Sequence, residues 1–466
     1  MSVLKHPAAP HLAPDAGTAP AAAGTSIQPG PAISRLQGQI QHYAWGSDVA
    51  IAALQARTLP TARPEAELWF GAHEAAPSLL LDAPGSPSLD AAIVDQPLAL
   101  LGAATATRFG GRLPFLLKVL AAARPLSLQV HPGVVEAVGG CAAEDRAGIP
   151  RAAADRCFRD PLPKPELLRA VTPFAALCGF RSPATTIELL RTLQLDSLSW
   201  LEEMIRATGH DASVPAVGRL LRLPATDRRV ALAQLRTAIA AVEGTPGRWH
   251  STLVRLRTLL DAYPDDAGVL VALLLDLIEL APGEAMFVPP GTPHAYLEGV
   301  GVEVMAASDN VQRGGLTSKH VDVEGFLALL GSPETARPAT QVARPRVLGR
   351  GHAGHRADTA YFALDEYRAD GGSHTLPERG PAIVLCLDGQ AELTTTGLTT
   401  ARPTTTGPTT TRQYISLAQG EAAFVPGTHT GVRLTCTGTT VMATPGASAP
   451  HVPAVPPSSP VDTGGG

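Results

Sequence analysis

The run LSLQVHPG (126–133) places a Ser, a Gln and a His at every second position of an otherwise apolar stretch. In an extended strand alternate side chains lie on the same face, so Ser127, Gln129 and His131 should share one face and the leucines and the valine the other. A polar face of this kind is also typical of an antiparallel strand at the surface. The chemical interpretation therefore depends on which residues meet this strand from elsewhere in the chain.

A further candidate, His294, closes the run GEAMFVPPGTPH (283–294), in which Pro and Gly follow an apolar stretch. Small antiparallel barrels use Gly and Pro to turn the chain at a tight corner and to aim the next side chain inward. We therefore expect His294 to point into a jelly-roll barrel of the cupin type, which holds a metal ion among inward side chains. The strand that carries Gln129 and His131 would meet it there.

The candidate metal ligands are Gln129, His131, Glu166 and His294, with Glu166 coming from the segment PLPKPELL. Neutral imidazoles and a carboxylate suit zinc and other borderline divalent ions, manganese among them, so we expect one divalent metal ion at this set. Spacing alone does not make the set specific. Gln is a poor ligand, and a His among apolar residues is often a hydrogen-bonded core residue.

Hydrophobic patterning indicates which elements must position these residues. Residues 35–182 contain short apolar runs separated by Gly and Pro, which is typical of strands. Residues 184–262 change to apolar spacings of three and four, which predicts helices. Strand texture returns at residue 283 and continues toward the C-terminus. We predict a mainly β fold with a helical insert, made of two cupin-type jelly-roll barrels and an all-α domain.

A weak internal echo supports two related β units, because GEAMFVPPGTPH (283–294) resembles GEAAFVPGTHTG (420–431). In the second corner His429 arrives one residue early, and a shift of one residue turns a strand side chain to the other face. We expect His429 to pack and to bind no metal. The Thr-rich tract at 393–414 should form a long surface loop within this unit.

The predicted parts of the chain follow from these patterns. The Ala- and Pro-rich start and the Pro-, Ser- and Gly-rich end have compositions typical of disorder. The parts are a disordered arm (1–30), a catalytic barrel (31–183 and 263–335), a helical insert (184–262), a second, metal-free cupin-like barrel (336–446) and a disordered tail (447–466).

Composition excludes several classes of function. The 466 residues, 45% of them hydrophobic, can build more than one core. The net charge of −5 comes without a polybasic run, so nucleic acid is not an expected partner. Five cysteines without CxxC spacing argue against a disulfide framework and suit the cytoplasm. The longest apolar run (268–281) is interrupted by Asp276 and is too short to span a membrane. We expect a monomer.

Five longer motifs occur in one order along the chain: QHYAWGS, ELWFGAHEAAPS, LPFLLKVLAAARPLSLQVHP, KPELL and GTPHAYLEGVGVEVMAASDNVQRGGLTSKHVDV. Together they resemble the type I phosphomannose isomerases, zinc-dependent cupin enzymes that interconvert mannose 6-phosphate and fructose 6-phosphate. The likeness covers residues 35–325, helical insert included, and weakens to architecture beyond residue 340. The resemblance places the family's zinc ligands on the same four residues that the alternation and turn arguments selected.

The resemblance also implies an aldose–ketose isomerisation, in which a proton moves between C2 and C1 through an enediolate. It places the catalytic arginine at Arg313, whose permanent charge suits an enediolate or the substrate phosphate, with a surface salt bridge as the structural alternative. Lys164 and Asp309 correspond to positions that would handle protons. Both could instead be structural ion-pair partners.

Further substrate-binding positions implied by the resemblance are Trp45, Lys118, Ser127, Tyr296, Glu303 and Lys319. Lys118 lies in the apolar run PFLLKVL, so its charge should have a phosphate or a carboxylate as partner. Lys319 could equally be a solvated loop residue. Trp45 and Tyr296 could be core aromatics.

This chain departs from the family pattern beside Lys164. Leu162 and Pro163 stand where the family commonly has Asn-His before Lys-Pro-Glu. A mechanism that relies on that histidine cannot operate here, so the proton must pass through Lys164, a bound water or another group. A milder change puts Glu74 where the family tends to have Pro.

Two other functions compete with this interpretation. A cupin iron dioxygenase would use His131, His294 and Glu166 as a two-histidine, one-carboxylate face, but it leaves Gln129 and the basic residues unexplained. A sugar-phosphate binding protein without turnover would agree with Pro163. Under the isomerase interpretation the partner is a phosphorylated hexose.

Overall fold

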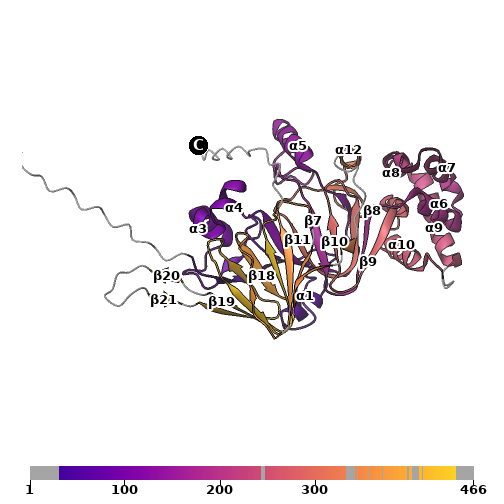
Figure 1. Cartoon of the computed structure of the whole chain (residues 1–466). Helices are drawn as coiled ribbons and strands as arrows, with labels where there is room; N and C mark the ends of the chain where they lie inside the picture. The colour runs from indigo at the N-terminus through magenta and orange to yellow at the C-terminus, as the bar shows by residue number, and fades with distance from the viewer. Residues whose placement is uncertain are drawn as a thin grey trace, which may run out of the picture.

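The computed structural model describes residues 31–242, 247–331, 342–343, 345–355, 357–369, 371–395, 398–400, 409–411 and 413–447. Across these ranges most elements are strands, and a group of helices lies at one end of the molecule (Figure 1). The prediction of a mostly β chain with helices is confirmed at this level. The predicted disordered arm (1–30) and residues 448–466 of the predicted tail lie outside the described residues.

The largest sheet has eleven strands and is organised around β11 (His294–Ala306). This strand pairs with β5 (Phe115–Ala122), β6 (Leu128–Val130), β7 (Glu166–Ala170) and β8 (Phe174–Phe180), in each case antiparallel. The start of β11 therefore lies beside β6, and its end lies beside the start of β7. The remaining strands of this sheet are β2 (Gln39–Gln41), β3 (Glu67–Phe70), β9 (Leu275–Leu280), β10 (Ala285–Val288), β12 (Gln312–Gly315) and β13 (Val342–Ala343).

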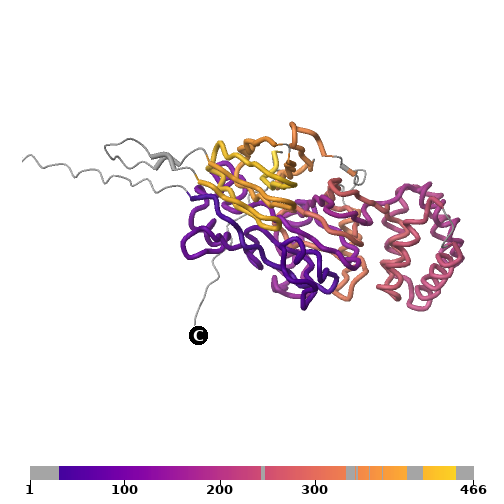
Figure 2. The backbone as a smooth tube through the Cα atoms, turned by 90° about the horizontal axis from the view of Figure 1, so that it is seen from below, coloured from indigo at the N-terminus to yellow at the C-terminus, as the bar shows by residue number. Residues whose placement is uncertain are grey.

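A second sheet of eight strands combines the two ends of the described chain. Its order is β14 (Arg346–Gly349), β15 (His352–His355), β16 (Ala363–Arg368), β25 (Thr439–Thr444), β18 (Ala382–Cys386), β23 (Ala422–Val425), β1 (Ser34–Gln37) and β4 (Leu79–Leu80). The first strand, β1, pairs with β23, and Figure 2 shows the indigo start of the chain beside the yellow C-terminal strands. The sequence-based division, which placed residues 31–183 in the first unit, did not predict this pairing.

A four-stranded sheet packs on the C-terminal part of the eight-stranded sheet. Its order is β17 (His374–Thr375), β24 (Arg433–Cys436), β19 (Gln390–Thr394) and β22 (Tyr414–Ala418). Val384 and Met442 from one sheet and Leu393, Leu417 and Leu434 from the other belong to one buried cluster. Alternate residues of each strand thus line a core between two sheets, as in a β-sandwich.

The Thr-rich tract is partly ordered into strands. β20 (Leu398–Thr400) and β21 (Thr409–Thr411) pair antiparallel, where the sequence had indicated a long surface loop. Residues 401–408, which connect them, lie outside the described residues.

The helical segment predicted at 184–262 forms helices over nearly the same range. Ser182 accepts a hydrogen bond from the Thr185 N–H and Pro183 occupies the first turn, both of which favour a helix start. The helices are α6 (Pro183–Leu193), α7 (Ser199–Thr208), α8 (Ser213–Leu221), α9 (Ala225–Val242) and α10 (His250–Ala262). Their buried leucines belong to the same large apolar cluster as Leu128 and Val130 of β6, the strand that carries Gln129.

Several helices occur where strand texture was expected. The segment at 89–108 is rich in Ala and Leu, which are strong helix formers. It contains α2 (Leu89–Asp95), α3 (Pro97–Leu101) and α4 (Ala103–Arg108), and α5 (Val134–Arg146) follows β6. The other helices are α1 (Ala50–Leu54), α11 (Gly268–Val271) and α12 (Val323–Leu330).

The longest apolar run is divided among three elements. It begins in α11, continues as a short 3-10 turn (Ala272–Leu274) and ends in β9. None of the helices in the described part of the chain combines the length and the apolar character needed to cross a bilayer.

Candidate metal centre

The strand β6 presents Gln129 away from the core. Leu128 and Val130 on either side are fully buried in one apolar cluster, whereas Gln129 is half-buried. The predicted alternation does not extend to Leu126, because the regular strand begins only at Leu128 and Leu126 packs into a different cluster with Tyr296. From Leu128 to Val130 the strand thus has one face in the core and one polar face that carries Gln129.

Three of the four predicted ligands converge where strands begin or end. His131 follows β6, Glu166 is the first residue of β7 and His294 is the first residue of β11. One candidate ligand atom from each lies within 4.8 Å of those from the other two, and all three residues are buried. Gln129 is the direct cross-strand partner of His294. Antiparallel partners share a face, so the Gln129 side chain lies on the same face of the sheet as His294.

The hydrogen bonds of the two imidazoles leave a place for a cation. Nδ1 of His131 lies 2.7 Å from the Asn310 carbonyl, and Nδ1 of His294 lies 3.0 Å from the Thr292 carbonyl. A carbonyl only accepts, so each Nδ1 carries the proton and each Nε2 carries a lone pair.

Both Nε2 atoms face the same carboxylate. They lie 3.2 Å and 3.4 Å from the oxygens of Glu166, and neither has a hydrogen-bond partner among the described residues. The carboxylate has no proton to donate to these two nitrogens, and buried acceptors without a donor are costly. A divalent cation would satisfy all of them, and backbone carbonyls behind metal-ligating histidines are typical of zinc sites. The donor set therefore fits zinc.

The protonation states also suit a metal. Burial, together with the nearby Lys164 ammonium, lowers the pKa of His131 to about 4, so this imidazole is neutral at neutral pH. Burial tends to raise the pKa of Glu166, but neighbouring groups, among them the Lys164 ammonium, outweigh it and hold the pKa well below its usual range. Lys164 Nζ lies 3.2 Å from Glu166 Oε1. Neutral imidazoles and an ionised carboxylate are the forms that bind metal ions.

Lys118 lies in a row of side chains that crosses three strands. Its cross-strand partners are Trp69 on β3 and Glu303 on β11. Nζ lies 3.6 Å from Glu67 Oε2 and 3.5 Å from Glu303 Oε2, and 4.8 Å from the centre of a Trp69 ring. Burial alone lowers the pKa of Lys118, but the two carboxylates more than offset it and raise the pKa. The buried charge is therefore compensated by carboxylates.

Tyr296 links Glu303 to the group of candidate metal ligands His131, Glu166 and His294, called the metal cluster from here on. Its hydroxyl donates to Glu303 Oε1 at 2.9 Å and lies 3.5 Å from Glu166 Oε2. Burial, and then the charge of Glu166, raises the pKa of Glu303 to about 7. Tyr296 is 1% exposed and packs in the core. Trp45 packs against the same apolar cluster and stacks on Tyr43 with ring centres 5.6 Å apart.

Cationic side chains flank the other side of Gln129. Arg313 on β12 is a cross-strand partner of Gln129, and Lys319 follows in an exposed loop with Nζ 5.4 Å from the centre of the Tyr43 ring. Burial lowers the pKa of Arg313, and Arg159 lowers it further. Within the described ranges Arg313, Lys319 and Arg159 form no ion pair with a carboxylate. The surface salt bridge considered for Arg313 is thus not seen. Ser127 lies half-buried just before β6.

Asp309 lies beside a histidine. Its Oδ1 is 3.2 Å from His73 Nε2, and its backbone N–H donates to Asp160 Oδ2 at 2.9 Å. Burial raises the pKa of Asp309, but the hydrogen bond from His73 and the charges of Lys164 and Lys118 outweigh it and lower the pKa to about 2. Asp309 is therefore ionised at neutral pH.

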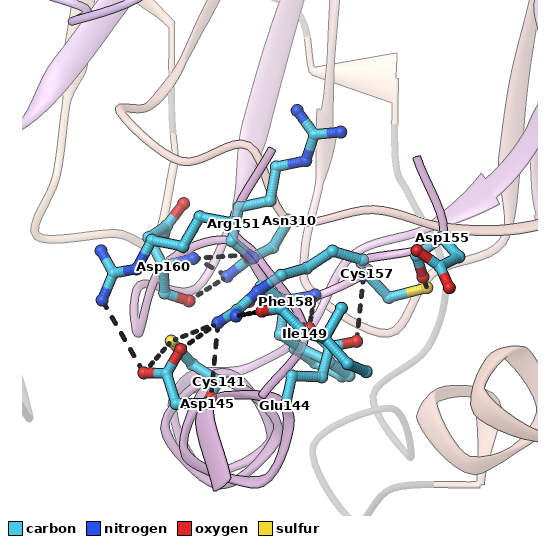
Figure 3. A network of polar contacts seen from close by, with 12 residues as sticks. Cys141, Glu144, Asp145, Ile149, Arg151, Asp155, Cys157, Phe158, Asp160 and Asn310 are labelled. Carbon is cyan, nitrogen blue, oxygen red and sulfur yellow. Dashed lines mark hydrogen bonds and ion pairs between the residues drawn. The ribbon is translucent and has the colours of Figure 1, made fainter. Parts of the chain in front are cut away.

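The loop before Lys164 is held by a buried arginine. Arg156 donates from Nε to the Phe158 carbonyl at 2.9 Å and pairs with Asp145 Oδ1 at 2.7 Å. Figure 3 shows Asp145, Phe158, Asp160 and Asn310 of the surrounding polar network. The side-chain amide of Asn310 donates to the backbone carbonyls of Asp160 and Leu162. The backbone carbonyl of Asn310 contacts His131 Nδ1. One residue thus connects this loop to the metal cluster.

The second corner differs from the first. The ring nitrogen Nε2 of His429 lies 2.7 Å from the Pro31 carbonyl, at the start of the described chain. Within the described ranges the group that could hold a metal ion is His131, Glu166 and His294.

Four further residues around the site were not predicted by reasoning from residue types. Glu67 and His73 belong to the quoted motif ELWFGAH, and Asn310 belongs to SDNVQ, so the motifs contained the signal. Arg159 lies outside the quoted motifs and carried no signal. Each of them contacts the site through a partner that is far away in the sequence.

Comparisons with known proteins agree with this geometry. Residues 33–183 match the family model for phosphomannose isomerase type I, catalytic domain. The chain is 36% identical to mannose-6-phosphate isomerase of Escherichia coli K12 over 84% of this chain and 94% of that protein. It is 35% identical to the Salmonella typhimurium LT2 enzyme over 87% and 98% of the two chains. A crystal structure of mannose 6-phosphate isomerase with zinc bound is similar with a TM-score of 0.76 and 34% identity, over 89% of this chain and 99% of that one.

Proposed function

Because this chain belongs to the type I phosphomannose isomerase family, we propose that it is a zinc-dependent aldose–ketose isomerase that interconverts mannose 6-phosphate and fructose 6-phosphate. The substrate is then a phosphorylated hexose, and the cofactor is one zinc ion per chain. The relatives named above are isomerases, so neither the iron dioxygenase nor the binding protein without turnover is favoured.

The observation that carries this proposal is the buried meeting of two imidazole lone pairs and a carboxylate. His131, His294 and Glu166 would hold the zinc ion, and the Gln129 amide would complete the set from the position opposite His294. Bound zinc would polarise the oxygens on C1 and C2 of the sugar and favour negative charge on them.

The proton-handling groups lie around this cluster. Isomerisation takes a proton from C2 and returns it to C1 through an enediolate. Asp309 is ionised and can accept a proton, and Lys164, next to Glu166, can donate one. Pro163 has no side-chain proton to exchange. The proton transfer would therefore use Asp309, Lys164 or a bound water.

The cations Arg313 and Lys319 suit the phosphate of the substrate. They lie near Arg159, without a carboxylate partner in the part of the chain that the structure describes. Like charges that repel one another favour an anion between them. Arg313 lies directly opposite Gln129 on the neighbouring strand. Its guanidinium would also stabilise the negative charge of the enediolate. Trp45, Ser127, Lys118, Tyr296 and Glu303 would complete the pocket.

The finer architecture is proposed with the function. The eleven-stranded sheet would form the catalytic cupin barrel, and the C-terminal sheets a second barrel that binds no metal. The helices at 184–262 would form an insert domain between the two halves of the first barrel. The cysteine usage favours the cytoplasm, and the proposed form is a monomer.

The decisive experiment measures metal and turnover on the same preparation. The purified chain should contain about one zinc per chain and form fructose 6-phosphate from mannose 6-phosphate in a coupled assay. A chelator should abolish activity, and added zinc should restore it. Activity that persists in metal-free protein would overturn the proposal, as would oxygen consumption without isomerisation.

A further inference from the structure

His73 and Asp309 form a pair next to Asn310, whose backbone carbonyl contacts the candidate ligand His131. His73 comes from the loop after β3, and Asp309 comes from the segment between β11 and β12. Their side chains are 7% and 38% exposed, so the histidine is enclosed while the carboxylate remains accessible from the site. The sequence analysis gave His73 no role.

The imidazole of His73 is fixed in orientation and tautomer. Its Nδ1 accepts the Ala75 N–H at 3.3 Å, so in the neutral ring the proton lies on Nε2, the atom that faces Asp309 Oδ1 at 3.2 Å. Trp69 packs edge-on against the ring, with centres 4.9 Å apart. His73 therefore reaches Asp309 as a donor without needing a positive charge.

Asp309 is restrained at two points. The backbone N–H is held by Asp160, and the side chain is held by His73. The other imidazoles of the cluster, His131 and His294, direct Nε2 at Glu166. The titratable and charged groups around Asp309 are His73 after β3, Lys118 on β5, Asp160 and Lys164 before β7, and Tyr43 after β2.

We propose that His73 is a positioning residue for the isomerisation: by donating its Nε2–H, it orients Asp309 and keeps it ionised as the proton carrier between C2 and C1. This proposal rests on the proposed function. From the aldose, the carboxylate takes the C2 proton while the C–H electrons form the C1=C2 bond and O1 becomes negative. The carboxylate then returns that proton to C1 as O2 becomes the ketone oxygen, and the O2 hydroxyl proton passes to O1.

A neutral donor suits this task. A hydrogen bond to the ionised form of a carboxylate favours that form, whereas burial alone disfavours it. Burial raises the pKa of Asp309, and the hydrogen bond from His73 is the largest of the contributions that lower it. Without His73 the carboxylate should take up a proton at higher pH and lose its fixed orientation.

The test compares His73→Leu, His73→Gln, Asp309→Asn and the double variant His73→Leu/Asp309→Asn. Asp309→Asn should lower kcat by about 100-fold or more, the size expected for loss of a proton-transfer group. His73→Leu should lower kcat by about 10- to 100-fold with KM within about threefold, and it should move the acidic limb of kcat/KM to higher pH. His73→Gln retains an N–H donor and should restore most of the activity.

The cycle should be strongly non-additive, because both single changes disable one unit. His250→Leu, an exposed histidine in α10, is the matched control and should leave kcat and its pH profile unchanged. A long-range 1H–15N spectrum of the wild-type protein, with and without zinc, should show His73 as the Nε2–H tautomer. This measurement does not depend on how well the variants fold.

Two results would overturn the inference alone. One is an active wild-type enzyme together with a double variant whose loss of kcat equals the product of the losses in His73→Leu and Asp309→Asn. The other is an Nδ1–H tautomer at His73. A wild-type chain that binds zinc but does not isomerise the sugar phosphate would instead overturn the proposed function.

Discussion

At the scale of single residues, the site depends on which atom of each side chain is already occupied. The backbone carbonyls of Asn310 and Thr292 bind the Nδ1 atoms of His131 and His294 and so turn both lone pairs toward Glu166. Gln129 has a different place, since its backbone lies between His294 and Arg313. Its side chain therefore lies on the face that it shares with both of these residues.

This difference predicts unequal effects of two alanine substitutions. His294→Ala should weaken zinc binding by at least about 100-fold, because a charge-neutral ligand is lost and Glu166 remains buried. Gln129→Ala should weaken it by only about 10-fold, because an amide is a poor zinc ligand. Competition with a chromophoric chelator measures both affinities.

His250→Ala is the control for the removal of an imidazole. It should leave zinc affinity at the wild-type value, because His250 is exposed in α10. Equal zinc affinity for His294→Ala and the wild type would rule out His294 as a ligand.

At the scale of elements, the two large sheets are joined by apolar packing and by a buried ion pair. Leu117 and Val302 of the eleven-stranded sheet share one cluster with Ile383 and Phe424 of the eight-stranded sheet. Beside it, Arg169 Nε of β7 lies 2.8 Å from Glu366 Oε2 of β16. The strand β7 that presents Glu166 is thus connected directly to the C-terminal sheet.

Removing one partner of this ion pair should destabilise the fold. Glu366→Gln leaves Arg169, which is 5% exposed, without its counter-charge, and should lower the free energy of unfolding by about 3 kcal/mol. Glu298, whose side chain is 61% exposed, pairs with Arg255 at the surface. Glu298→Gln should lower the free energy of unfolding by less than about 1 kcal/mol. Urea denaturation of the metal-free forms compares the two variants.

The same pair predicts a dependence on pH. Burial raises the pKa of Glu366, but the hydrogen bonds from His355 and Arg169 outweigh it and lower the pKa below its ordinary value of 4.5. A carboxylate with a lowered pKa stabilises the fold fully above the unfolded-state pKa, and this contribution is lost as the pH falls through the folded-state pKa. The Tm of the wild type should therefore fall below about pH 4.5 more steeply than that of Glu366→Gln. Parallel curves would contradict this assignment.

At the scale of the whole molecule, the metal cluster lies where distant segments meet. Its ligands come from residues 129 to 294, and the helices α6 to α10 share their core with β6. The chain start completes the eight-stranded sheet through the pairing of β1 with β23. Filling the site should therefore stabilise the folded chain as a whole.

Zinc should raise the Tm in proportion to the logarithm of its concentration. A ligand that binds only the folded state stabilises by about 2.7 kcal/mol at a concentration 100-fold above its Kd. The effect should be large here, because the buried acceptors of His131, His294 and Glu166 have no donor among themselves. Calorimetry with and without a chelator measures it. A Tm of Glu166→Gln that still rises as in the wild type would contradict this site.

The sequence by itself determined the local patterns and the chemistry that they allow. Alternation identified Gln129 and His131, turn residues identified His294, and the change of period at residue 184 identified the helices between residues 184 and 262. These signals act over a few residues, so they survive without any knowledge of packing.

Only the tertiary structure decided which residues meet. Strand pairing placed Gln129 opposite His294, brought His73 to Asp309 and Glu67 to Lys118, and moved β1 to the C-terminal sheet. The regular strand also begins only at Leu128, so Leu126 lies outside the alternation of buried and polar side chains. Register and long-range contacts depend on the packing of the whole core, in which each segment competes with every other. For that reason the ligand types were readable from the chain, but the partners that orient them were not.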